Sequence, residues 1–248
     1  MIYGTIGLLV GIVMGLTGAG GALIAIPLFM NLLEASLKEA TVLSLVAVVF
    51  GTSVNLLGQF SRVNKKIALT LGAAGAVSNY LTLPLKTGTP EVVIAGLLTL
   101  IGVFSVTSVW RRKDQSHGQS DESPAVAKAL MAGTFLGLIT TLTGLGGGVL
   151  LLPILLKVFK KTYQEALPTS LATILLISLT SFIFQSKTAL NLMTYDQLAL
   201  IGGGALASYF MLKLFLRKLE ERMLLLIRQI VFTVVTVYSV LSVIVKTM

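Results

Sequence analysis

Long apolar runs separated by short polar stretches make up most of the chain. The runs cover about residues 36–60, 67–85, 91–110, 164–186, 194–213 and 222–246. A helix rises about 1.5 Å per residue, so about 20 to 25 residues cross a hydrocarbon core of about 30 Å with some tilt. The pattern therefore predicts an all-α polytopic membrane protein in which these six segments span the bilayer.

Two further apolar segments, residues 3–33 and 129–159, are interrupted by glycine. The first contains GLTGAGG at 15–21, and the second contains TLTGLGG at 141–147. The stretches on either side of the first phrase are about 12 to 14 residues long, or some 18 to 21 Å as helices. Such lengths are too short to span comfortably. Each segment is therefore expected to form two half-helices that meet at the glycines.

The two glycine phrases belong to a repeat with an offset of 126 residues. The matches that carry it are Thr17 with Thr143, Pro27 with Pro153, Glu39 with Glu165, Ser44 with Ser170, and Gln59 with Gln185. We expect two homologous halves, residues 1–110 and 129–248. The polar residues 111–128 between them are predicted to form a flexible aqueous linker.

Lysine and arginine distinguish two topologies. If both glycine-interrupted segments span, the halves are parallel, there are eight crossings, and nine basic residues face ten across the membrane. If each segment turns back at its glycines, all of the 19 basic residues lie on one side except Lys38, Lys86, Lys187 and Lys246. The positive-inside rule favours the second arrangement. It has two inverted repeats, each a re-entrant helical hairpin plus three transmembrane helices, with both termini outside and residues 111–128 cytoplasmic; eight parallel transmembrane helices are the alternative.

Composition excludes several other classes of function. Only 12% of the residues are charged, and the basic ones, which give a net charge of +9, follow the ends of apolar segments, so no nucleic-acid partner is expected. The chain has no cysteine, which excludes disulfides and thiolate metal sites. No carboxylate falls in the middle of an apolar segment. We therefore expect no proton relay of the Asp/Glu/His kind, no enzyme activity, no cofactor and no metal.

The glycine phrases themselves suggest a chemistry. A break at membrane depth leaves backbone groups unpaired, which costs several kcal/mol unless the break is buried in protein or lines a polar cavity. The first N–H groups of the second half-helix, at the positive end of its dipole, then form an anion site. We expect this site near the middle of the membrane, with two breaks contributing Thr17, Gly18, Gly20, Gly21, Thr143, Gly144, Gly146 and Gly147. A purely structural bend is the alternative.

Other polar residues in the apolar segments are further candidates. Ser44, Gln59, Thr169, Ser170 and Gln185 either bind the substrate or join helices through hydrogen bonds. Gly7, Gly11 and Gly15 are spaced four residues apart, and this spacing is typical of close helix packing. They are expected to pack against a neighbouring helix.

The phrases TGAGGALIAIPLF and TGLGGGVLLLPIL, together with EALPTSLA at 165–172, resemble the sulfite exporter TauE/SafE family of membrane transporters. The resemblance covers nearly the whole chain, although Ala22 stands where the second copy has Gly148. It implies a multi-pass carrier in the plasma (inner) membrane of a bacterium or archaeon. It also implies a sulfur-containing anionic substrate such as sulfite or an organosulfonate.

These observations predict a secondary transporter of small anions. It would bind its substrate between the two glycine breaks and export it by alternating access. Its partners would be the anion and the lipid bilayer, with a homo-oligomer left open. A passive anion channel and a non-transporting membrane scaffold are the two rival functions.

Overall fold

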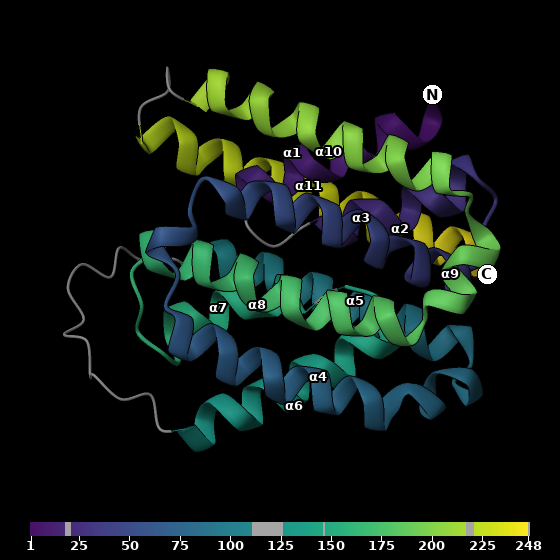
Figure 1. Ribbon diagram of the computed structural model, residues 1–248, viewed down its shortest axis with the longest axis horizontal. Coiled ribbons are helices and arrows are strands. Elements are labelled where there is room, and N and C mark those ends of the chain that lie inside the picture. Colours follow the sequence, from purple (N-terminus) through teal and green to yellow (C-terminus); the bar gives the residue numbers. More distant parts are fainter. Residues whose placement is uncertain (18–20, 111–125, 146, 217–220, 248) are drawn as a thin grey trace.

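The computed structural model describes the whole chain except residues 18–20, 111–125, 146, 217–220 and 248. The described residues form helices and no strand, which confirms the all-helical prediction (Figure 1). The helices are α1 (Ile2–Thr17), α2 (Gly21–Leu32), α3 (Leu37–Leu57), η1 (Phe60–Arg62), α4 (Lys65–Gly88), α5 (Glu91–Trp110), α6 (Val126–Thr143), α7 (Gly148–Lys157), α8 (Tyr163–Phe184), α9 (Ser186–Leu192), α10 (Tyr195–Leu216) and α11 (Glu221–Thr247).

Six of the described helices are long and apolar enough to cross a membrane, namely α3, α4, α6, α8, α10 and α11. Five of them match predicted spanning segments. The sixth, α6, was expected to be a half-helix of the segment 129–159, but it has 18 residues and is long enough to span. It begins at Val126, inside the stretch predicted to be linker. The predicted span at 91–110 forms α5, whose apolar stretch Glu91–Thr107 is shorter. The chain is therefore a multi-pass membrane protein. Helix α6 is longer than expected, and the apolar stretch of α5 is shorter.

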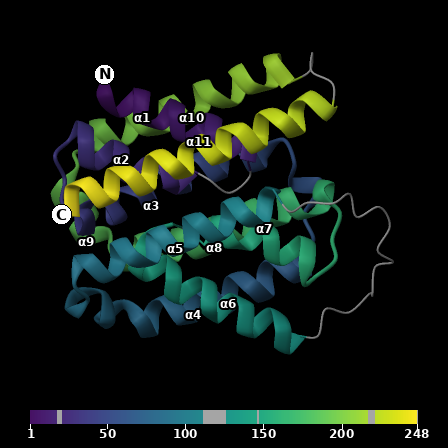
Figure 2. The same cartoon turned by 180° about the vertical axis from the view of Figure 1, so that it is seen from behind.

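Figures 1 and 2 show where the helices begin and end along the bundle. One end, the terminal end, holds both chain termini and residues 33–36, 89–90 and 193–194. The opposite end, the linker end, holds residues 58–64 and 158–162. Helix α1 starts and α2 ends at the terminal end, whereas α6 starts and α7 ends at the linker end. The remaining long helices run from one end to the other.

The helices pack in equivalent pairs. Helix α1 packs against α10 as α6 packs against α4, and α2 packs against α11 as α7 packs against α5. Helices α3 and α8 contact each other, and each also contacts the helix pair that holds a glycine phrase. Each half of the sequence therefore supplies helices that cover the glycine-interrupted pair of the other half.

Glycines allow the closest of these contacts. A Cβ added at Gly7 would lie 2.1 Å from the Ile201 carbonyl oxygen of α10, and one added at Gly11 would lie 2.0 Å from Ser208 Oγ. The equivalent contact between α6 and α4 is as tight, because a Cβ at Gly137 would lie 2.3 Å from the Gly75 carbonyl oxygen. The packing role predicted for the glycine ladder of α1 is confirmed.

Candidate substrate site at the two helix breaks

The second break is built by the backbone. Helix α6 ends at Thr143 and α7 begins at Gly148, and both Gly144 and Gly147 have a φ of +68°. This left-handed conformation favours glycine, which has no Cβ to clash with the following carbonyl. Gly147 occupies the N-cap position of α7 without a capping side chain. The glycines of the phrase are thus required by the geometry of the break.

Gly144 also lies against the central helix α3. A Cβ added there would lie 2.2 Å from the Thr41 carbonyl oxygen. Ser44 is fully buried, and its Oγ lies 3.0 Å from the Gly144 carbonyl oxygen and 2.8 Å from the Thr41 carbonyl oxygen of its own helix, so its one proton is shared between the two. A carbonyl exposed by a helix break needs such a partner in an apolar environment. Ser44, a predicted site residue, therefore lies beside the second break, within hydrogen-bond distance of its backbone.

The first break is also packed tightly on its described sides. Gly21 starts α2 and is buried, and a Cβ added there would lie 2.2 Å from Met14 Cγ of α1. Met14 also contacts α3, since a Cβ at Gly51 would lie 3.1 Å from its sulfur. Three further predicted site residues, Gly18, Gly20 and Gly146, lie outside the described residues.

The threonines of both phrases donate their hydroxyl protons to their own helices. Thr17 Oγ1 donates to the Val13 carbonyl and Thr143 Oγ1 to the Ile139 carbonyl, both at 2.7 Å. Both residues are buried. A hydroxyl has one proton, so in this conformation neither threonine donates to a bound anion. At the start of α7 the Gly148 N–H donates to the Leu145 carbonyl at 3.4 Å and the Leu150 N–H to the Gly147 carbonyl at 3.3 Å. The Val149 N–H between them is therefore the backbone donor that the start of α7 offers.

The two breaks contact α3 at different heights. Gly144 contacts α3 at Ser44, whereas Gly15, near the end of α1, lies so close to Asn55 that a Cβ would be 2.5 Å from its Oδ1. The 11 residues between Ser44 and Asn55 correspond to about 16 Å along the helix. The ends of α1 and α6 therefore do not converge on one point beside α3.

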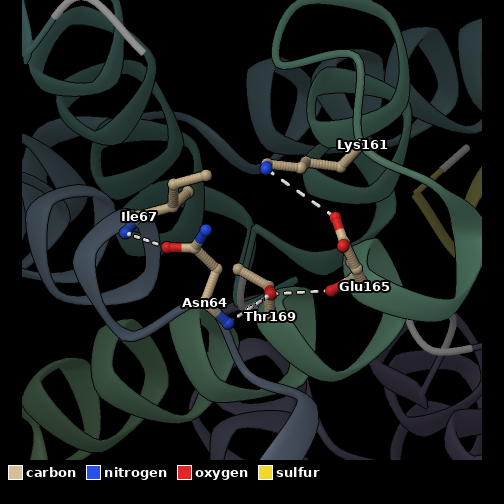
Figure 3. Close-up of polar contacts among 5 residues, drawn as sticks. All are labelled: Asn64, Ile67, Lys161, Glu165 and Thr169. Atoms are coloured by element: carbon tan, nitrogen blue, oxygen red, sulfur yellow. Dashed lines mark hydrogen bonds and ion pairs between the residues drawn. The ribbon is translucent and has the colours of Figure 1, made fainter. Parts of the chain in front are cut away.

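Thr169 and Ser170 follow each other on α8 and make different contacts. Thr169 Oγ1 accepts from the Asn64 backbone N–H at 3.0 Å and donates to the Glu165 carbonyl at 2.7 Å (Figure 3). Asn64 caps α4, and Lys161 lies 3.7 Å from Glu165 in an ion pair. Thr169 thus fastens the start of α4 to α8 at the linker end. Ser170 is fully buried, and its Oγ donates to the Leu167 carbonyl at 2.8 Å.

The two predicted glutamines lie at opposite ends of the bundle. Gln59, at the linker end, is partly exposed, and its Nε2 lies 3.5 Å from the Asn55 carbonyl. Gln185, at the terminal end, is buried, and its Oε1 accepts from Lys86 Nζ at 2.7 Å. The structure therefore brings together only some of the predicted site residues, those around the second break.

A buried network beside the second break was missed by the sequence-based site. Asn79 of α4 donates to the Ile177 carbonyl at 2.9 Å and to Thr180 Oγ1 at 3.2 Å, both on α8. Its Oδ1 accepts from Thr141 Oγ1 of α6 at 2.9 Å, just before the break. Asn79 thus joins three helices from both halves. A polar residue within an apolar run was the available signal, but its partners belong to the other half of the chain.

Replacing Asn79 by leucine is expected to destabilise the protein, by about 1–3 kcal/mol, because the change leaves buried groups on two helices unpaired. The midpoint of thermal unfolding in detergent measures this. Thr70→Val is the matched control, since the exposed Thr70 hydroxyl donates only to the Lys66 carbonyl of its own helix. Equal midpoints for the two variants would contradict the bridging role of Asn79.

The sequence was compared with known protein families and with curated proteins. The family model described as Sulfite exporter TauE/SafE matches residues 3–241. No curated protein matches the chain. The matched range includes both glycine phrases and all or most of each helix that packs against them. The chain therefore belongs to the sulfite exporter TauE/SafE family.

Proposed function

We propose that this protein is a secondary transporter that exports a small sulfur-containing anion, either sulfite or an organosulfonate, by alternating access. Its family consists of transporters rather than enzymes. The observation that carries the proposal is the position of the two helix breaks. They lie inside the bundle beside the central helices, and the chain reaches them from opposite ends, through α1–α2 from the terminal end and through α6–α7 from the linker end (Figures 1 and 2).

We infer that α1–α2 and α6–α7 are re-entrant hairpins in two inverted repeats, residues 1–110 and 129–248. The equivalent packing of α1 on α10 and of α6 on α4 supports a pseudo-twofold relation between the repeats. The linker end is taken as cytoplasmic, in the inner membrane, because most basic residues lie there. Those on described segments at this end include Arg62, Lys65, Lys66, Lys128, Lys157, Lys160 and Lys161.

The half-helices α2 and α7 supply the binding chemistry in this proposal. In it, the first turns of these helices, which begin at Gly21 and Gly148, direct the positive end of a helix dipole toward the anion, and on α7 the Val149 N–H is the backbone donor. The breaks contact α3 at different heights, so the anion binds one half-site before the other as the repeats move against each other. No basic side chain is needed at the breaks, and the anion can leave without separating from a fixed charge.

The driving force for export follows from the negative charge of the transported anion. The acidic residues of the described segments, Glu34, Glu39, Glu91, Glu165, Asp196 and Glu221, all lie in loops or first turns of helices. A proton relay through the middle of the membrane is therefore not part of the proposal. A membrane potential that is negative inside favours exit of an anion by about 2.3 kcal/mol per charge per 100 mV. Electrogenic export of the anion needs no further coupling ion.

Purified protein reconstituted into vesicles tests the proposal. Vesicles loaded with unlabelled sulfite are expected to take up labelled sulfite by counterflow, with a saturable initial rate, whereas chloride-loaded vesicles are not. A passive channel would give uptake without this stimulation. Rates equal to those of protein-free vesicles for sulfite and for simple sulfonates would contradict transport and favour a scaffold.

The same vesicles test the driving force. A potassium diffusion potential of about 100 mV, negative inside, is expected to shift the equilibrium distribution of a monovalent anion outward by about 50-fold, the equivalent of about 2.3 kcal/mol. The measurement is the internal sulfonate concentration with and without valinomycin. A sulfonate distribution that does not change with the membrane potential but changes with a pH gradient would contradict electrogenic export and indicate proton coupling.

A further inference from the structure

One face of α8 carries buried polar atoms without hydrogen-bond partners. They are Ser178 Oγ, Ser181 Oγ and Gln185 Nε2, in side chains that are 0%, 1% and 7% exposed. Spacings of three and four residues place all three on one side of the helix. Buried polar atoms are nearly always paired, so a group of unpaired ones points to something that binds there.

The equivalent residues of the first half either have hydrogen-bond partners or are partly exposed. Thr52 Oγ1 donates to the Val48 carbonyl at 2.6 Å. Asn55 Nδ2 donates to the Gly51 carbonyl at 2.8 Å and to the Gly11 carbonyl at 3.3 Å. Gln59 is partly exposed. The unpaired atoms are thus a property of the second half and do not follow from the repeat.

Lys86 adds a positive charge to this face. Its Nζ donates to Gln185 Oε1 at 2.7 Å, and the side chain is only 7% exposed. Lysine has no acceptor, so the amide oxygen faces Lys86 and the unpaired Nε2 remains a donor. In the described part of the chain the contact given for Lys86 Nζ is this amide oxygen, and no carboxylate pairs with it.

The cluster lies beyond the second break, toward the terminal end. Asn79 binds both Thr141 of α6 and Thr180 of α8, which places the end of α6 at the height of Thr180 and Ser181. Gln185 follows one turn later on α8, and Lys86 follows two turns after Asn79 on α4. An anion that leaves the break toward the terminal end therefore passes this cluster.

We propose that Lys86, Gln185 and Ser181 form a second binding site for a small oxyanion such as sulfite, located between the second break and the terminal end. The site offers ammonium, amide and hydroxyl donors, which match the acceptor oxygens of such an anion, and the anion balances a buried charge. Its role in export rests on the proposed function. A three-residue slip in the repeat aligns Gly75 and Tyr80 with Gly204 and Tyr209, and the position equivalent to Lys86 is then Phe215. This second binding site therefore exists at one end only and makes the two directions of transport unequal.

Sulfite binding to the purified protein in detergent tests the site without reference to transport. Isothermal titration is expected to show that Lys86→Met weakens sulfite binding by about tenfold or more and Gln185→Leu by several-fold. Lys66→Met, at the exposed start of the same helix α4, is the matched control and is expected to leave the affinity unchanged. Without sulfite, Lys86→Met should unfold at the same temperature as the wild type or higher, because it removes a buried charge that lacks a carboxylate partner.

The outcomes separate this site from the proposed function. If Lys86→Met binds sulfite as tightly as the wild type, the site is refuted even if vesicles transport sulfite. If the wild type does not transport but Lys86→Met loses sulfite binding, the site stands and the transport proposal fails. Should Lys86→Met not fold, Lys86→Arg is expected to retain sulfite binding while Gln185→Leu weakens it. Equal affinities for these two variants would also refute the site.

Discussion

Replacing Gly144 by alanine is expected to abolish sulfite transport and to destabilise the protein strongly. The residue has a φ of +68°, and its new Cβ would lie 2.2 Å from the Thr41 carbonyl oxygen of α3. The left-handed conformation costs about 1–2 kcal/mol for alanine, and the clash with a rigid backbone adds about 1–3 kcal/mol. Relief of the clash would move the break away from α3 and from its hydrogen bond with Ser44.

Gly147→Ala separates the backbone strain of the left-handed conformation from the steric clash with α3. Gly147 has the same φ of +68°, but the nearest atom to a new Cβ would be Thr140 Oγ1 at 3.2 Å. This variant should lose only about 1–2 kcal/mol and keep part of its transport rate. Gly96→Ala on α5, where no atom lies within 4 Å of a new Cβ, is the control. Vesicle uptake and the thermal midpoint measure the series. Gly144→Ala matching Gly96→Ala in both would show that the packed break is not needed.

The second large effect is expected from Gly204→Leu on α10. A Cβ at Gly204 would lie 2.1 Å from the Gly4 carbonyl oxygen and 2.7 Å from the Leu8 nitrogen, so leucine would force α1 away from α10. Overpacking of a core costs about 1–3 kcal/mol when side chains can adjust, and here the obstructing atoms are backbone. We expect little or no folded protein.

The neighbouring residue provides the matched control for this change. Gly203 is exposed on the same helix, and a Cβ there meets no atom within 4 Å. Gly203→Leu should therefore fold like the wild type, since its side chain would point toward lipid. Size-exclusion chromatography in detergent measures both. If the two variants give equal yields of monodisperse protein, the close contact between α1 and α10 is not essential to the fold.

Much of the architecture could be predicted from local pattern. Apolar run length identified five of the six candidate spans, and the four-residue glycine spacing of α1 identified its packing face. Both signals are local, because helix length and helix faces depend on residues near in sequence. The length of α6 was missed because its first residues continue from a polar stretch that composition alone assigned to the linker.

The candidate site was predicted less well, because its contacts join different halves. Ser44 meets Gly144, Asn79 meets Thr141 and Thr180, and Lys86 meets Gln185, each pair about 60 to 100 residues apart. The hydrophobic periodicity of a sequence does not predict such long-range pairs. The expected hydroxyl donors, Thr17 and Thr143, are a different case. Threonine within a helix commonly bonds the carbonyl four residues earlier, and both do so here.

Labelling of single cysteines tests most directly whether the helix breaks are reached from opposite sides of the membrane. The chain contains no cysteine, so Glu34→Cys, between α2 and α3, and Gln164→Cys, at the start of α8, each give one exposed thiol. In intact cells a membrane-impermeant maleimide is expected to label the cysteine at position 34, and to label the one at position 164 only after permeabilisation. Labelling of both from the same side would contradict the re-entrant hairpins and support eight parallel crossings.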